Sequence, residues 1–352
     1  MYYLDPRVES LYRIYDQNER EAYLRLDLNE NPGGLPSSVL ENTLRQITPE
    51  LIAQYPETQP FKETLANYLG TDPSHLCLTN GSAEAVRYVI RAFTSEGGRM
   101  VGVFPSFVMF QVYAELYGRN LVQIPYEEDL HMDINRILAA MTEDTQLLIL
   151  VNPNNPMGNV YTEDEFRTLL SEAERKQITV LVDEAYHYFC PETFLRYALE
   201  RENVLVTRTF SKLFSMAGCR LGYVAGWPRG VEMVQKLCTP HNINVFALRL
   251  AQTVLETPGL TEQLIRDFQQ GREYLMQKLD QNGYQYRIGA GNFSFIQPHT
   301  SAKELVEQMR VKKKILIKAY PNVGVLGDCL RVTIGAKPYM SRFVEALLDL
   351  DR

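Results

Sequence analysis

One lysine, Lys212, stands in a segment whose other residues suit a phosphorylated carbonyl compound. Lysine is the side chain that forms Schiff bases with carbonyl groups, and burial or a nearby cation favours the uncharged amine that reacts. Thr209 and Ser211 can donate hydrogen bonds to phosphate oxygens, and Arg220, eight residues beyond Lys212, can pair with a phosphate through its planar fork. A solvated surface position would be the ordinary interpretation of Lys212 alone, so its meaning depends on the other segments.

An aspartate, Asp183, directly follows the apolar run at residues 178–182, and Tyr186 lies three positions further on. A carboxylate at the end of a buried strand is unfavourable unless it is solvated or paired with a cation. A pyridinium N–H would be such a partner, and this pairing is what lets pyridoxal phosphate act as an electron sink.

Two further segments offer polar groups directly after apolar runs. Ser82 and Ala83 follow a glycine and open a stretch with helical spacing, where free backbone N–H groups attract an anion. Asn152 opens the segment Asn-Pro-Asn-Asn-Pro-Met-Gly and can both donate and accept. A plain helix start and a structural turn are the simpler interpretations of each segment alone. Taken together, the four segments supply an anion cradle, a phenolic-oxygen partner, an acidic anchor and an amine, which predicts pyridoxal 5′-phosphate as the cofactor.

The chemistry-bearing segments follow apolar runs that alternate with helical stretches such as residues 163–175. Several runs are rich in Val, Ile and Leu without strict alternation, which is typical of strands buried on both faces. The runs are residues 76–78, 100–104, 147–151, 178–182, 204–206 and 221–225. Because ligands bind at the carboxyl ends of strands in open α/β sheets, the polar segments should converge. The pattern predicts an α/β domain with a mainly parallel sheet flanked by helices.

After about Pro240 the pattern changes to a smaller α+β domain. A long helical stretch at residues 246–282 is followed by strand-like runs at residues 284–288, 293–296 and 330–334. The first thirty residues are charged and tyrosine-rich with weak periodicity, which favours an arm that joins the small domain. The predicted organisation is an arm at residues 1–30, a large cofactor-binding domain at 31–240 and a small domain at 241–352.

Composition narrows the class of protein. The 352 residues suit two domains, and the net charge of −7 argues against bulk binding to nucleic acid or to an anionic membrane. No apolar run approaches membrane-spanning length, and the first residues contain no signal-peptide core. The five cysteines are scattered without a CxxC pair, which favours reduced thiols and no metal site. We therefore expect a cytoplasmic protein.

The order and spacing of the segments resemble the fold-type-I pyridoxal-phosphate-dependent aminotransferases, and more narrowly their histidinol-phosphate aminotransferase branch. The matching segments cover nearly the whole chain. They are residues 26–32 (Leu-Asp-Leu-Asn-Glu-Asn-Pro), 55–56 (Tyr-Pro), 152–158, 182–186 (Val-Asp-Glu-Ala-Tyr), 209–220, 292–293 (Asn-Phe) and 330–335 (Leu-Arg-Val-Thr-Ile-Gly).

The resemblance implies a catalytic core around Lys212. This lysine holds the cofactor as a Schiff base and, once the substrate releases it, moves the proton. Asp183 pairs with the pyridine nitrogen, while Asn152 and Tyr186 bind the phenolic oxygen. The implied phosphate ligands are Ser82, Ala83, Thr209, Ser211 and Arg220.

The resemblance also implies the surroundings of that core. Phe107 stacks on the ring, in a position that carries tyrosine in the branch. Tyr55 reaches the phosphate from the other subunit of a homodimer. Arg331 clamps the substrate carboxylate beside Asn152, and Lys318 stands where the branch has an arginine for the substrate phosphate. Lysine keeps the charge of that position but not the forked geometry.

Three functions are consistent with these residues. The leading one is an aminotransferase that passes an amino group between an amino acid, or an amino-alcohol-phosphate-like donor, and a 2-oxo acid such as 2-oxoglutarate. A decarboxylase of an O-phospho amino acid on the same scaffold differs in which Cα bond lies perpendicular to the ring. A cofactor-sensing regulatory module would need a fused DNA-binding domain. The chain is expected to start almost at the arm, which leaves no room for such a domain.

Overall fold

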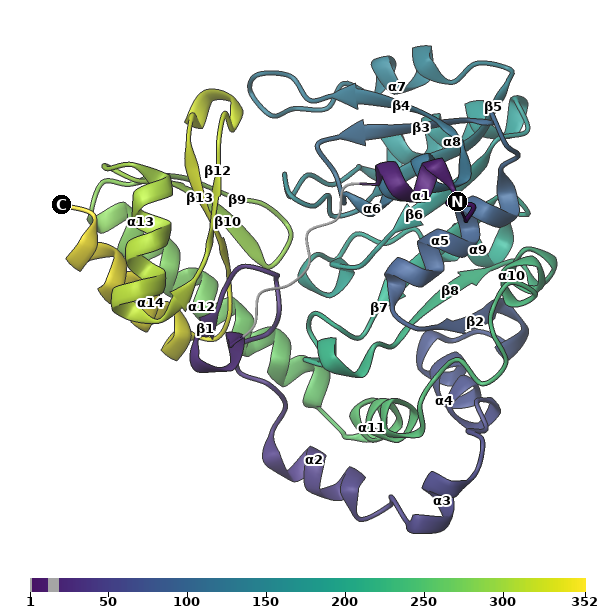
Figure 1. Cartoon of the computed structure of the whole chain (residues 1–352), viewed down its shortest axis with the longest axis horizontal. Coiled ribbons are helices and arrows are strands. Elements are labelled where there is room, and N and C mark those ends of the chain that lie inside the picture. Colours follow the sequence, from purple (N-terminus) through teal and green to yellow (C-terminus); the bar gives the residue numbers. More distant parts are fainter. Residues whose placement is uncertain (1, 12–18) are drawn as a thin grey trace.

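A seven-stranded sheet forms the centre of the protein in the computed structural model, which describes residues 2–11 and 19–352 (Figure 1). The strand order is β2-β8-β7-β6-β5-β3-β4, and β8 runs antiparallel to both neighbours while the other pairs are parallel. The strands are β2 (Leu76–Thr79), β3 (Arg99–Phe104), β4 (Asn120–Pro125), β5 (Thr145–Val151), β6 (Thr179–Asp183), β7 (Val204–Thr209) and β8 (Gly222–Gly226). The predicted α/β class with a mainly parallel sheet is confirmed.

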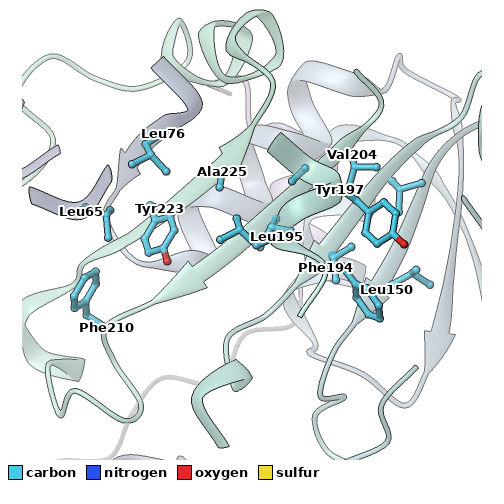
Figure 2. Close-up of a cluster of buried hydrophobic side chains, with 14 of the residues drawn as sticks. Leu65, Leu76, Leu150, Phe194, Leu195, Tyr197, Val204, Phe210, Tyr223 and Ala225 are labelled. Carbon is cyan, nitrogen blue, oxygen red and sulfur yellow. The ribbon is translucent and has the colours of Figure 1, made fainter. Parts of the chain in front are cut away.

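Helices cover both faces of this sheet, which explains why its central strands are mainly apolar. One apolar cluster joins the sheet to α4 (Gln59–Leu69), α8 (Glu163–Arg175), α9 (Leu195–Glu200) and α11 (Val245–Glu256). Figure 2 shows part of it, with Leu65 of α4 and Tyr197 of α9 beside Leu76, Val204 and Ala225 of the sheet. A second cluster packs the other face against α5 (Ser82–Phe93), α6 (Met109–Tyr117) and α10 (Pro228–Gln235). We call this sheet and its helices the large domain.

A four-stranded antiparallel sheet, with order β12-β13-β10-β9, forms the small domain. Its core packs against α12 (Leu260–Gln281), α13 (Ala302–Gln308) and α14 (Lys337–Leu350). Its strands are β9 (Gln285–Ile288), β10 (Phe293–Gln297), β12 (Lys318–Tyr320) and β13 (Cys329–Thr333).

The remaining short helices are α2 (Ser37–Leu44) and α3 (Pro49–Ala53), which lie between β1 and α4 along the chain, and α7 (Ile134–Ala140), which lies between β4 and β5 of the large domain. Tight 3₁₀ turns occur at Arg20–Ala22, Pro73–His75, His187–Phe189, Ala217–Cys219 and Gly324–Leu326, and a π-helical turn at Met309–Lys313. No helix among the residues the structure describes is both long and apolar enough to cross a membrane.

The N-terminal segment contacts both domains. β1 (Leu24–Arg25) pairs in parallel with β11 (Ile315–Leu316) of the small domain. α1 (Pro6–Ser10) instead lies against α6 of the large domain, where Arg7 forms an ion pair with Glu96. Residues 1 and 12–18 of the predicted arm lie outside the described part.

The stretch predicted as one helix over residues 246–282 is two helices, α11 and α12. The chain breaks at Pro258 and Gly259, where Gly259 takes a left-handed φ of +72°. Since α11 and the first turns of α12 pack in the large-domain core, we propose that the domain boundary lies within α12, near Phe268, rather than at residue 241.

Two glycines bring the backbones of the two domains into close contact. A Cβ added to Gly158 would lie 2.7 Å from the Cα of Gly289, and a Cβ added to Gly289 would lie 2.5 Å from the Cα of Gly158. Beside them, the N–H of Ala290 donates to the carbonyl of Gly158 at 2.9 Å. Arg287 of β9 adds a 2.8 Å hydrogen bond to Asn159 Oδ1. The small domain thus touches the loop after β5 through bare backbone.

Candidate active site

The N-terminus of α5 and the guanidinium of Arg220 meet at Gly81. A Cβ on Gly81, whose φ is +84°, would lie 2.5 Å from Arg220 Nη2, so this approach requires glycine. A Cβ on Gly222 would lie 2.5 Å from the backbone nitrogen of Ser82. The first N–H groups of a helix have no partner within it, so those of Ser82 and Ala83 can bind an anion beside Arg220.

Two hydroxyls complete this cradle. Thr209 Oγ1, at the end of β7, donates to Ser211 Oγ at 3.0 Å, and Arg220 Nη1 lies 3.5 Å from the same Ser211 oxygen. Helix N–H groups, hydroxyls and a guanidinium are the donor set that a phosphate dianion requires. The five residues predicted to hold phosphate are therefore suitably placed for it.

Asp183 ends β6 and is buried in the sheet. Burial raises the pKa of its carboxyl from 3.8 to about 6. Thr207 Oγ1 at 3.1 Å and the N–H of Ala185 at 3.2 Å both donate to Oδ1. A cationic N–H brought to the other oxygen would compensate the buried charge, which is what a pyridinium would provide.

Lys212 lies between the two domains. Its Nζ donates to the carbonyl of Leu28, in the segment after β1, at 2.9 Å, and stands 5.5 Å from the centroid of the Tyr186 ring. The lysine and the tyrosine predicted to act together are therefore neighbours.

The hydroxyl of Tyr186 accepts two amide hydrogen bonds. Asn29 Nδ2 donates to it at 2.8 Å and Asn155 Nδ2 at 3.1 Å. A phenol has two acceptor positions and one proton, so the proton of Tyr186 must point to a third group. Asn155 has its amide orientation fixed, because Arg331, which can only donate, binds its Oδ1 at 2.7 Å.

Arg331 is a buried cation without a carboxylate partner among the described residues. Its side chain packs over the ring of Phe293, with the guanidinium carbon 4.7 Å from the ring centroid, and its Nε has no hydrogen-bond partner. Arg208 is equally buried but differs from Arg331 in having a carboxylate partner, because it donates hydrogen bonds of 2.9 and 2.7 Å to Glu184. An unpaired buried guanidinium is unfavourable unless an anion joins it.

A second cation stands beside Arg331 on the small-domain sheet. Lys318 of β12 is directly opposite Arg331 of β13 in the antiparallel register, which places both side chains on one face. Tyr320 lies on the same face, with its ring 5.7 Å from the Arg331 guanidinium carbon. Two positive charges and an aromatic ring thus lie on one face of the small-domain sheet, and Arg331 reaches Asn155 from this sheet.

Asn152 lies elsewhere than predicted. Its Oδ1 accepts from the N–H of Tyr161 at 3.0 Å, and its Nδ2 lies 3.5 Å from the carbonyl of Glu192. This fully buried side chain therefore braces the loop, and the amide that meets Tyr186 and Arg331 is that of Asn155. The sequence reasoning missed Asn155 and Asn29, although both lie in segments that it singled out.

Phe107 and Tyr55 form no hydrogen bond or ring contact with the other predicted site residues within residues 2–11 and 19–352. Phe107 precedes α6 and packs edge-on against Phe110, with ring centroids 5.9 Å apart. Its neighbour Ser106 lies 3.5 Å from Asn154 of the loop after β5. Tyr55 is 80% exposed and stacks on His241 at 4.6 Å, which leaves it available to a second subunit.

Comparisons with known proteins place this architecture in a family. The family of class I and II aminotransferases matches residues 21–347. The chain is 30% identical over 341 residues to histidinol-phosphate aminotransferase of Thermococcus gammatolerans, covering 96% of this chain and 94% of the relative. It is 31% identical over 331 residues to histidinol-phosphate aminotransferase 1 of Trichormus variabilis, covering 94% and 92%.

Solved structures share the fold. Histidinol-phosphate aminotransferase of Sinorhizobium meliloti, in complex with pyridoxal 5′-phosphate, superposes with a TM-score of 0.87 at 22% identity, covering 99% of this chain and 97% of that one. L-threonine-O-3-phosphate decarboxylase of Porphyromonas gingivalis gives 0.77 at 21% identity, covering 93% and 98%. The predicted pyridoxal-phosphate-dependent aminotransferase is thereby confirmed at the level of the family. This chain belongs to the class I and II aminotransferases.

Proposed function

We propose that this aminotransferase takes its amino group from a donor that carries a phosphate, as histidinol phosphate does, and passes it to a 2-oxo acid such as 2-oxoglutarate. The observation that carries the proposal is Arg331, a buried guanidinium whose described partners include no carboxylate, with Lys318 opposite it in register. One cation suffices for a carboxylate, and the second provides for the additional charge of a phosphate. The names of relatives at 30% identity support the same donor.

The residues present fit pyridoxal 5′-phosphate, which when bound supplies an electron sink for the donor's Cα. Ser82, Ala83, Thr209, Ser211 and Arg220 would hold its phosphate group. The Asp183 carboxylate would keep the ring nitrogen protonated, since a buried carboxylate gains most from a cationic partner.

Four side chains would act at the reacting end. Lys212 would hold the cofactor's carbonyl carbon and, once released, its Nζ would take the proton from the donor's Cα. Tyr186 would donate its hydroxyl proton to the phenolic oxygen, because Asn29 and Asn155 already fill its acceptor positions. Arg331 and Asn155 would orient the donor by its anionic group.

The test is a half-reaction survey of the purified holoenzyme. Histidinol phosphate, histidinol, phosphothreonine, glutamate and an aliphatic amino acid are each added without an oxo acid, and formation of pyridoxamine phosphate is followed with release of CO₂. We expect histidinol phosphate to react at least tenfold faster than histidinol, and no CO₂ from any donor. Equal rates for the two would contradict a phosphate site, and CO₂ from phosphothreonine would identify a decarboxylase instead.

Two variants locate the phosphate site. Lys318→Met should weaken the apparent affinity for histidinol phosphate and leave that for glutamate nearly unchanged. Arg331→Met should weaken both. If Lys318→Met affects glutamate as strongly as histidinol phosphate, Lys318 does not recognise the phosphate.

A further inference from the structure

Two cysteines far apart in the sequence lie in contact outside the active site. Cys77 of β2 and Cys238, three residues after α10, are 161 positions apart, yet their sulfur atoms are 3.7 Å from each other. The remaining three cysteines have no such thiol neighbour among the described residues.

This thiol pair lines a surface cavity of about 510 Å³. Cys77 is buried while Cys238 is partly exposed, so the second thiol is the one that a reagent in the cavity meets first. Lys62 of α4 lines the same cavity and lies close enough to interact electrostatically with Cys77. This cation acts to lower the pKa of Cys77 and so favours the loss of its proton.

The contact makes the two sulfurs unequal. The hydrogen bond between the two thiols lowers the pKa of Cys238, while the same bond, together with burial, raises the pKa of Cys77. Cys238 is therefore the better nucleophile, and Cys77 is positioned to attack a sulfur attached to it.

We propose that Cys77 and Cys238 form a reversible dithiol–disulfide site that reacts with low-molecular-weight disulfides. The Cys238 thiolate attacks the small disulfide, forming a mixed disulfide and releasing one small thiolate. Cys77 then loses its proton and its sulfur attacks Cys238 Sγ, releasing the second small thiolate. In sum, two protein thiols and one small disulfide give one protein disulfide and two small thiols.

The site would link two functional segments. β2 leads directly into Gly81 and Ser82 of the anion cradle, and the chain after Cys238 leads to His241, which stacks on Tyr55. The disulfide would bind these segments together and close a loop of 161 residues, so the oxidised protein should unfold at a temperature several degrees higher.

The experiment exposes the folded holoenzyme to oxidised glutathione, quenches with an alkylating agent in denaturant, and counts alkylated cysteines by intact mass and peptide mapping. We expect three alkylated cysteines and a Cys77–Cys238 crosslinked peptide, with all five recovered after dithiothreitol. Cys77→Ser should stop at a stable glutathione adduct on Cys238, and Cys238→Ser should retain all four remaining thiols. Cys219→Ser, which removes a partly exposed cysteine elsewhere, should leave the crosslink intact.

Several outcomes would overturn the proposal. These are five alkylated cysteines in the oxidised wild type, a crosslink that forms only in denaturant, or a glutathione adduct that Cys77 never resolves. The Cys→Ser variants are compared by circular dichroism before treatment, so that a misfolded variant is recognised and the wild-type crosslink map decides.

Discussion

Arg331 of the small domain and Tyr186 of the large domain are joined through one side chain, the amide of Asn155. The amide accepts from Arg331 at 2.7 Å and donates to Tyr186 at 3.1 Å. The group that would bind the substrate anion and the group that would bind the cofactor's phenolic oxygen therefore share one hydrogen-bonded link. An anion that binds Arg331 in place of Asn155 would therefore alter the hydrogen bond that the Tyr186 hydroxyl accepts from Asn155.

Asn155→Ala should affect both ends of this link. The KM for anionic donors should rise roughly tenfold, as for a lost hydrogen bond to a charged group. The pKa of the bound cofactor chromophore should rise. Without Asn155 one acceptor position of the Tyr186 hydroxyl is empty, so this hydroxyl is no longer held as a donor to the cofactor's phenolic oxygen. Asn152→Ala is the matched control in the same loop, and it should lower stability by about 1 kcal/mol without moving the absorbance titration. A shift in the Asn152 variant alone would restore the role first predicted for that residue.

Lys212→Ala should abolish the visible absorbance of lysine-bound cofactor and leave the protein folded. Lys212 is only half-buried, and its Nζ donates a hydrogen bond to the backbone carbonyl of Leu28, so its loss costs little packing. Absorbance spectra and circular dichroism of the purified variant make the measurement. A visible band that survives in the variant would remove Lys212 from its role.

Asp183→Asn should stabilise the cofactor-free protein in a pH-dependent way. The folded-state pKa is raised to about 6, so folding favours the protonated carboxyl, and stability falls as pH rises from about 4 to about 6. Asparagine cannot ionise, so the variant should exceed the wild type by about 3 kcal/mol above pH 6 and match it below pH 4. Urea unfolding of both proteins between pH 4 and 7 measures the difference. A difference that does not vary with pH would contradict the buried carboxylate.

Replacement by leucine should lower the stability of the protein at Arg208 but not at Arg331. Arg208→Leu leaves Glu184 buried without its cation and should cost roughly 3–5 kcal/mol of unfolding free energy. Arg331→Leu removes an unpaired buried charge, so stability should hold while the KM for anionic donors rises roughly 10- to 100-fold. Denaturant unfolding combined with steady-state kinetics separates the two. Equal destabilisation would mean that Arg331 is a structural residue.

Tyr55 should act in the site of a second subunit. Tyr55→Ala and Lys212→Ala are each expected to be inactive, but mixing the two under conditions of subunit exchange should restore activity. The mixed dimer contains one site with an intact lysine and an intact tyrosine from its partner. Light scattering should give twice the mass of the chain. No recovery in a verified mixed dimer would place Tyr55 outside the partner's site.

Much of the large domain could be predicted because its polar residues stand at the ends of apolar runs. Asp183, Ser211 and Lys212 follow buried strands, and the helix over residues 163–175 begins with the capping pair Thr162 and Glu165. The edge strand Asn120–Pro125 was missed because it has no continuous apolar run, and only Ile124 in it is buried.

The finer errors arise where neighbouring residues have the same chemistry. Asn152 and Asn155 both precede a proline in one loop, and their chemistry gives no reason to prefer either. Which of the two asparagines enters the site depends on the position of Arg331, which lies in the other domain and 176 positions from Asn155. The break between α11 and α12 had a local signal, Pro258-Gly259, which the strong apolar periodicity on both sides outweighed.

The contact between Gly158 and Gly289 brings the two domains as close together as backbone atoms allow. Backbone cannot change rotamer as a side chain can, so any residue larger than glycine at either position would push the two domains apart. Arg331 and Asn155, which hydrogen-bond at 2.7 Å between the same two domains, would then be separated. The bond between the substrate-side cation and its amide thus depends on two residues that have no side chain.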